Sequence, residues 1–356
     1  MRYFHPMFLL ALLLGVWGCD RPDRPPPADT VPEVEEPDIG AAADDMDEDF
    51  GDTDIWHFDD DDTLTTLPPQ RAQMAASTAM EGLPVGPTLY DGDRWCSGNS
   101  YVPATIGAGM PDRIAPVLKK ANDCNMRIAL TLPRSLFTSN GLNHGPYNAV
   151  RARRAMDVVA AKLAQVPSAH RDNLLYYSVL DDMGCEACWG GTKVTHEQTA
   201  AHTRYARSKF PSWVAVGLRV DPAWMAQSRI TDWRVDVTTV QWHTRKGPKN
   251  LSGVPKQKAW YEASRLVAPK LGIKRMIYAV NIHDCDGAPH ATDGRPCSPQ
   301  EIRDYGAAAI NFDPATNCGF LSWRYDGVYF HRDDYERAWR EIIELGRSKP
   351  KLLCKA

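Results

Sequence analysis

The sequence predicts an α/β fold in which parallel strands alternate with helices and close on themselves, a (β/α)8 TIM-type barrel. Leu174–Met183 begins with an almost uninterrupted apolar run, which is typical of a strand buried on both faces. Each predicted strand is followed by a helix or a long crossover, so the strands should be parallel. An open doubly wound sheet is the alternative, but no glycine-rich phosphate loop follows the first predicted strand.

Seven strands can be assigned in order. An eighth, degenerate strand is expected either between Trp95 and Ile106 or before Leu83. The predicted strands are Val85–Tyr90, Met126–Leu132, 174–182, Trp213–Val220, Val235–His243, Arg275–His283 and Cys318–Asp326. The predicted helices are Asp112–Cys124, Tyr147–Ala164, Thr195–Lys209, Lys258–Leu271, Ser298–Ile310 and Asp333–Leu345. Thr195 and Gln198 have the spacing of a capping box at a helix start.

Residues 1–19 have the layout of a bacterial export signal. Arg2 precedes the apolar run Met7–Val16, which is too short to span a bilayer comfortably. The stretch Val16-Trp17-Gly18-Cys19 resembles a lipobox, which implies cleavage before Cys19 and lipidation of its sulfur. An ordinary secretory signal is the alternative. We therefore expect a membrane-anchored protein of the bacterial cell envelope, on the periplasmic face of the inner membrane or at the outer membrane or cell surface.

Residues 20–80 are expected to be a disordered, acidic, proline-rich tether, followed by the barrel at 81–350 and a short C-terminal tail at 351–356. Residues 20–62 hold 18 acidic residues against 2 arginines, a net charge of −16, whereas the whole chain has −4. The globular body is therefore basic, which favours an anionic partner such as an acidic polysaccharide. No nucleic-acid-binding motif is present, and we expect a monomer without a cofactor.

Three stretches resemble the glycoside hydrolase (β/α)8 superfamily. Residues 125–133 are similar to the third barrel strand of its cellulase-like members, 174–182 to the fourth, and 319–326 to the eighth, where a Trp lines the sugar site. The chain also resembles a family of bacterial lipoproteins with such a barrel. Two departures stand out: the fourth strand ends Asp181-Asp182 instead of Asn-Glu, and the usual glutamate after the seventh is replaced by His283 and Asp284.

The resemblance implies a carboxylate pair, because glycoside cleavage uses one protonated and one ionised carboxyl group. Asp182 is the expected acid/base and Asp284 the expected nucleophile or base, since they match the two catalytic strands of the superfamily. Asp181 would then tune or orient. Adjacent residues of a strand point to opposite faces, so only one of Asp181 and Asp182 can face the barrel axis unless the strand has already ended.

Aromatic, basic and polar residues near the predicted strand ends could bind a sugar. Tryptophan can stack on apolar sugar faces, and arginine binds carboxylate or sulfate. The substrate-binding candidates are Asp93, Trp95, Trp189, Arg219, Trp242, His243, Asn281, His283, Trp323 and Arg324. No histidine spacing supports a metal site. A glycan-binding barrel without turnover and an envelope scaffold are the alternatives to a glycosidase.

The nine cysteines become an even set of eight if Cys19 carries lipid, which predicts disulfides in an exported protein. Short spacing predicts the bridges Cys185–Cys188 and Cys285–Cys297. The other four, Cys96, Cys124, Cys318 and Cys354, could pair in three ways. A redox pair or half of a zinc site is the alternative for Cys185 and Cys188.

Overall fold

The computed structural model describes residues 81–90, 95–96, 102–108, 110–283, 285, 295–323 and 325–355, and the structural statements below concern these residues. The predicted signal peptide, the lipidation of Cys19 and the tether at 20–80 lie outside them. So do three predicted site residues, Asp93, Asp284 and Arg324.

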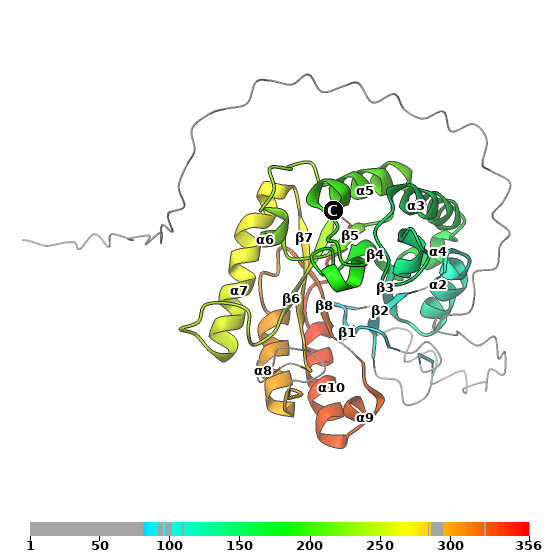
Figure 1. Ribbon diagram of the computed structural model, residues 1–356. Coiled ribbons are helices and arrows are strands. Elements are labelled where there is room, and N and C mark those ends of the chain that lie inside the picture. Colours follow the sequence, from blue (N-terminus) through cyan, green and yellow to red (C-terminus); the bar gives the residue numbers. More distant parts are fainter. Residues whose placement is uncertain are drawn as a thin grey trace, which may run out of the picture. The chain divides into compact units, whose positions relative to one another are not determined.

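Eight parallel strands form one sheet in the order β1-β8-β7-β6-β5-β4-β3-β2. The strands are β1 (Val85–Pro87), β2 (Ala104–Ala108), β3 (Arg127–Thr131), β4 (Leu174–Asp181), β5 (Val216–Arg219), β6 (Val237–Trp242), β7 (Arg275–Val280) and β8 (Asn317–Ser322). The two end strands meet through a parallel bridge between Thr88 and Ile106, where the Leu89 N–H donates to the Ile106 carbonyl at 2.7 Å. The sheet is thus a TIM-type barrel, as predicted (Figure 1). The eighth strand is β2, which begins inside the interval predicted between Trp95 and Ile106 and runs two residues past it.

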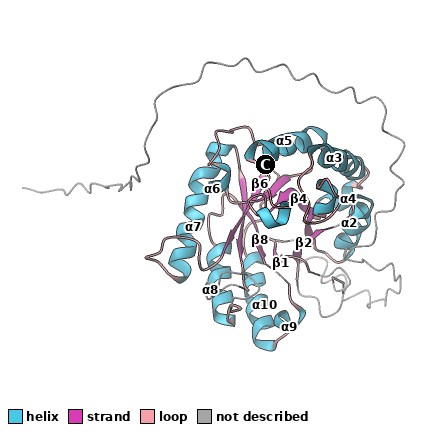
Figure 2. Ribbon diagram, in the orientation of Figure 1, coloured by secondary structure: helices cyan, strands magenta, loops and turns pink. Residues whose placement is uncertain are grey.

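The helices surround the strands in the ribbon views (Figure 1 and Figure 2). They are α2 (Ile114–Asp123), α3 (Ala149–Ala164), α4 (Ser168–Arg171), α5 (His196–Lys209), α6 (Pro222–Met225), α7 (Gly253–Val267), α8 (Pro299–Ile310), α9 (Gly327–Phe330) and α10 (Asp333–Arg347). Short 3-10 turns are η2 (Pro111–Arg113), η3 (Arg134–Phe137), η4 (Glu186–Trp189) and η5 (Ala268–Leu271).

The helix boundaries follow local chemistry. The predicted capping box at Thr195 is present, and Ser298 makes a second one with Glu301. The helix predicted at Lys258–Leu271 instead begins at Gly253 and ends at Val267. It starts earlier because Pro255 is tolerated in a first turn, where its missing N–H is not needed.

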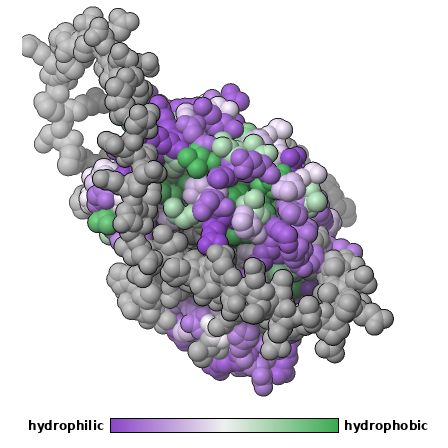
Figure 3. Space-filling model, turned by 90° about the vertical axis from the view of Figure 1, so that its right-hand side faces the viewer, coloured by the Kyte–Doolittle hydropathy of each residue, from purple (hydrophilic) through white to green (hydrophobic). Residues whose placement is uncertain are grey.

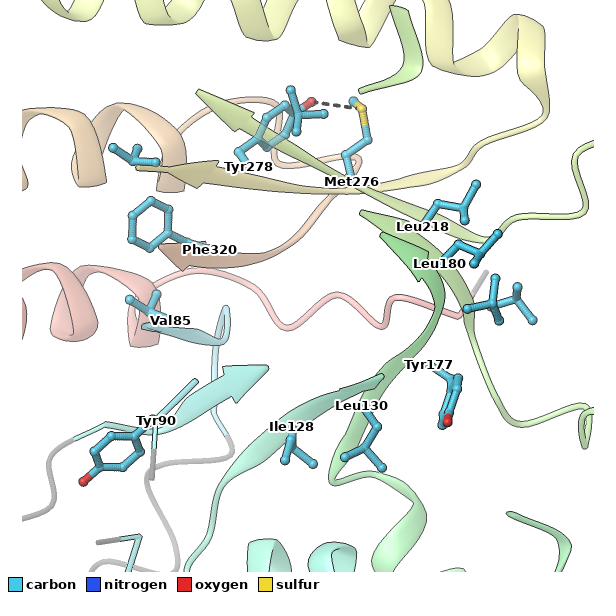
Figure 4. Packing of buried hydrophobic residues seen from close by; sticks show 14 of the residues in the cluster. Val85, Tyr90, Ile128, Leu130, Tyr177, Leu180, Leu218, Met276, Tyr278 and Phe320 are labelled. Carbon is cyan, nitrogen blue, oxygen red and sulfur yellow. Dashed lines mark hydrogen bonds between the residues drawn. The ribbon is translucent and has the colours of Figure 1, made fainter. Parts of the chain in front are cut away.

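The core has two layers, one between the strands and the helices and one inside the barrel. Figure 4 shows the outer layer, where the Tyr278 hydroxyl donates to the Met276 sulfur at 3.8 Å. Ile277, between them in β7, belongs to the inner layer, as strand alternation requires. The inner layer consists of Ala104, Ile106, Ala129, Leu175, Tyr176, Ala215, Val237, Ile277, Cys318, Leu321 and Cys354.

The end of the barrel where the strands begin, called the floor here, is covered by the C-terminal segment. Cys354 is buried and bonded to Cys318 at the start of β8. Lys355 pairs with Asp236, just before β6, at 2.8 Å, and Arg275 at the start of β7 donates to the Leu353 carbonyl at 3.1 Å. The opposite end of the barrel, where the strands end, is called the mouth here.

Four disulfides occur, and both bridges predicted from short spacing, Cys185–Cys188 and Cys285–Cys297, are confirmed. The remaining cysteines pair as Cys96–Cys124 and Cys318–Cys354. None of the helices in the described ranges is long and apolar enough to cross a membrane. On the face shown in Figure 3, the coloured surface is largely hydrophilic with a few hydrophobic residues between.

Candidate functional site

A β-bulge near the end of β4 turns Asp181 into the barrel. Ser178 is in register with Gly217 of β5, but the next paired residue, Asp181, is in register with Arg219. Strand β4 therefore holds one residue more than β5 over this interval. Tyr176 lies inside the barrel and Leu180 in the outer core layer, so Asp181 takes the inward position that regular alternation would have given to Leu180.

Asp181 forms an ion pair with Arg219 inside the mouth. The two side chains are 2.6 Å apart and are 20% and 12% exposed, respectively. The second carboxylate oxygen of Asp181 accepts the Asp182 N–H at 2.9 Å. The Arg219 guanidinium carbon lies 5.5 Å from the ring centroid of Trp323, within cation–π range.

The layer beneath the ion pair is fixed by close packing. A Cβ atom on Gly217 would lie 2.1 Å from the ring of Tyr176, so only glycine fits there. The Tyr176 hydroxyl lies 3.1 Å from the hydroxyl of Thr239 on β6. This buried pair closes the bottom of the mouth and positions the strand segments that carry Asp181 and Arg219.

Burial raises the pKa of Asp181 to about 6, and the negative charge of Asp182 adds to the increase, although the positive charges of Arg219 and Arg134 oppose it. A carboxyl group with a pKa near the working pH can both give and take a proton. Asp181 therefore changes its protonation state closer to neutral pH than an ordinary aspartate does.

Asp182 lies on the rim of the mouth. Its backbone is left-handed, with φ of 54°, and its side chain is 51% exposed. Its carboxylate pairs with Arg134 of η3 at 2.6 Å, and its carbonyl accepts the Trp189 indole N–H at 3.0 Å. Arg134 also lies 5.7 Å from the Trp189 ring centroid. The geometry thus favours Asp181 over Asp182, the predicted acid/base, as the carboxyl group that faces the barrel interior.

Asn281 is the first residue after β7. It bridges to Trp323 of the neighbouring segment, and its side-chain oxygen accepts the His283 N–H at 3.1 Å. An amide side chain therefore occupies the position directly after β7. An ion pair, a cation–π contact and a backbone bridge link Asp181, Arg219, Trp323 and Asn281 in one continuous series at the mouth.

Three predicted sugar-stacking residues, Trp95, Trp189 and Trp242, are 3%, 0% and 0% exposed. Their indole N–H groups donate to backbone carbonyls, that of Trp242 to Lys246 at 3.0 Å. A fully buried ring offers no face to a ligand, so these residues pack the shell around the mouth, contrary to the prediction. Trp242 points outward because it alternates with Gln241, which has the inward parity of Thr239.

His243 and His283 are half-buried, and the His283 ring lies 5.4 Å from that of Tyr329. Among the described residues there is no group of three metal-ligating side chains. Four more residues lie at or near the mouth that were not predicted from the sequence: Arg134, Tyr176, Thr239 and Gln241.

The alternation of Thr239 and Gln241 along β6 could have indicated that both face the barrel interior. The contact of Arg134 with Asp182 joins residues 48 positions apart, so no local pattern could have indicated it.

The comparisons with known proteins concern the fold. The sequence matches no family model and no curated protein. In structure, the chain is similar to GH26C from Muricauda sp., with a TM-score of 0.49, 9% identity, and coverage of 80% of this chain and 90% of that one. It is also similar to the endoglucanase Cel5A of Pseudomonas stutzeri, with a TM-score of 0.48, 10% identity, and coverage of 74% and 89%. A third is the endo-beta-N-acetylglucosaminidase of Cordyceps militaris, with a TM-score of 0.46, 9% identity, and coverage of 79% and 96%.

The strand order on its own establishes the barrel. The chain therefore has a TIM-type barrel, as the sequence predicted.

Proposed function

We propose that the mouth of the barrel binds a carbohydrate and that Asp181 transfers the proton in cleavage of a glycosidic bond. The observation that supports this most is the position of Asp181: the bulge turns it into the mouth, beside Arg219 and Trp323, with a pKa of about 6. In the proposed reaction, protonated Asp181 gives its proton to the bridging oxygen as the bond from that oxygen to the sugar carbon breaks.

The second group of the reaction is proposed to be Asp284, which follows β7 in the sequence but lies outside the described residues. Its carboxylate would attack the sugar carbon or activate a water molecule. Arg219 would orient Asp181 and, after proton transfer, stabilise the carboxylate that forms. The half-buried Trp323 offers a ring to one sugar face, and the basic body favours an anionic polysaccharide.

Binding without cleavage is the second candidate function. It is favoured by the departure after the seventh strand, where His283 and Asp284 stand in place of the usual glutamate of the resembled superfamily. The arginine partners of Asp181 and Asp182 also favour it, because a carboxylate held in an ion pair resists protonation.

Product analysis by mass spectrometry on a panel of acidic and neutral polysaccharides separates the two functions. Asp181→Asn should abolish product release while keeping binding, whereas Asp182→Asn, on the rim, should lower the rate much less. Asp284→Asn should also abolish release. If the wild type and the variants bind glycans in an array but none of them releases product, the binding function is supported. If the wild type neither binds glycans nor releases product, this proposal is contradicted.

Anchoring to a bacterial envelope membrane through lipid on Cys19 is also part of the proposal. Metabolic labelling with a fatty acid should mark the wild type, and Cys19→Ser should lose the label and be released from membranes. A labelled Cys19→Ser protein would contradict the anchor.

A further inference from the structure

We propose that the Cys185–Cys188 disulfide is a reducible site on the rim of the mouth, and that a dithiol which opens it loosens the loop carrying Asp182 and Trp189. The two cysteines are half-buried and only 3 residues apart in the sequence. They lie between β4 and α5, directly after the residues that form the mouth. This inference concerns the loop itself and does not depend on the proposed function.

Access distinguishes this disulfide from two of the other three. Cys285 and Cys297 are 7% and 0% exposed, and Cys318 and Cys354 are 0% and 3% exposed. Because an attacking thiolate must reach a sulfur atom directly, burial protects these two bridges. Cys96–Cys124 is also half-buried, and so it serves as the internal comparison for the experiment.

The hydrogen bonds of the turn favour one direction of attack. The Cys188 N–H donates to the Cys185 sulfur at 3.2 Å, which would stabilise negative charge on Cys185 as the S–S bond breaks. The first thiolate of the dithiol therefore attacks Cys188, forms a mixed disulfide there and releases Cys185 as a thiolate. The second thiolate then attacks the reductant's own sulfur and releases Cys188. The protein gains two electrons and two protons, and the dithiol becomes a disulfide.

The bridge is coupled to the mouth through the carbonyl of Asp182. This carbonyl accepts the Cys185 N–H at 2.9 Å and the Trp189 indole N–H at 3.0 Å, so donors on both sides of the bridge hold it. The Val194 N–H, which donates to the Met183 carbonyl at 3.0 Å, closes the loop. Opening the bridge removes the covalent restraint between the two donors, and the backbone next to Asp181 loses rigidity.

The experiment uses the full chain under native conditions with increasing dithiothreitol, followed by alkylation and peptide mass spectrometry. Cys185 and Cys188 should be alkylated at least tenfold faster than the cysteines of the two buried bridges, and at least as fast as those of Cys96–Cys124. A monothiol, 2-mercaptoethanol, should leave its adduct on Cys188. Faster opening of Cys96–Cys124, or an adduct on Cys185, would overturn the proposed access or direction of attack, respectively.

Hydrogen exchange then tests the coupling. In the selectively reduced protein, amides of residues 183–194 should exchange at least tenfold faster, while those of β6 keep their rates. The double variant Cys185→Ser with Cys188→Ser should show the fast exchange without reductant. If the reduced wild type keeps the slow exchange of the oxidised protein, the coupling is refuted, whatever the variant does.

Discussion

At the floor, where the strands begin, the barrel is covered by its own C-terminal segment, whereas charged and polar side chains lie at the mouth, where the strands end. At the floor, Ala129, Leu175 and Cys318 pack with the buried Cys354, a disulfide fixes the cover, and Lys355 pairs with Asp236. The mouth holds an ion pair, Asp181 with Arg219, and a left-handed aspartate on its rim.

The difference separates a covalently closed end of the barrel from the end to which the proposed function is assigned. Apolar burial and a long-range covalent link stabilise the floor. Partly buried charges and a strained backbone at the mouth are unfavourable for folding, and we propose that they are retained for the carbohydrate site. The same division between a stabilising N-terminal face and a chemical C-terminal face is general in TIM barrels.

The largest expected effect tests where the mouth ends and its supporting shell begins. Trp242→Ala should lower the free energy of unfolding by about 5 kcal/mol, because it empties a fully buried site. Trp323→Ala, at a half-buried position, should lower it by about 2 kcal/mol and instead weaken glycan binding. Urea unfolding and binding assays measure the two effects. Equal destabilisation with unchanged binding would mean that Trp323 also belongs to the shell.

The second expected effect compares one disulfide at each end. In the chain-entropy model, removing the floor bridge, with a sequence separation of 36, lowers stability by about 4 kcal/mol, and removing the rim bridge, with a separation of 3, by about 1.5 kcal/mol. Denaturant unfolding of the two double Cys→Ser variants measures the difference. Similar losses from both variants would show that the floor cover contributes no more than the rim turn.

The fold was predictable because the barrel depends on repeated local patterns. The apolar run at 174–182 identified β4, and alternation of strands with amphipathic helices required parallel pairing. The strand β2 was placed only as an interval, because its five residues, Ala-Thr-Ile-Gly-Ala, carry little apolar signal. The close approach of β1 depends on Gly86, because a Cβ there would lie 1.7 Å from the backbone carbonyl oxygen of Ala104.

The site was predictable only in part, because one added residue changes which side chain faces inward. Strict alternation cannot say whether Asp181 or Asp182 enters the barrel, and the bulge that decides it depends on the register with β5. The burial of Trp189 and Trp242 likewise depends on helices and loops that cover them. In contrast, Arg219 and Trp323 could be placed, since each lies at or directly after a strand end with a clear apolar pattern.

The third expected effect is a pH dependence at the mouth. The folded-state pKa of Asp181, about 6, lies above its ordinary value of 3.8, so its contribution to stability is complete below pH 3.8 and is lost as the pH rises through 6. Between pH 7 and pH 5 the wild type should gain about 1 kcal/mol of unfolding free energy relative to Asp181→Asn. Urea titrations at both pH values measure the gain. A relative loss on acidification would show that Arg219 outweighs burial.

The smallest expected effect concerns the rim pair of Arg134 with Asp182. Since the two side chains are 23% and 51% exposed, Arg134→Gln should lower the unfolding free energy by less than about 1 kcal/mol. Lys119→Gln, which breaks a helix surface pair with Asp123, is the matched control and should have a similarly small effect on stability. Only Arg134→Gln should speed hydrogen exchange in residues 182–194, because it removes both the partner of Asp182 and the cation above Trp189. If both variants leave the exchange rates of that loop unchanged, the rigidity of the rim depends on the disulfide and the backbone hydrogen bonds. Among the described charged residues, only Asp181 and Arg219 would then be assigned to the mouth.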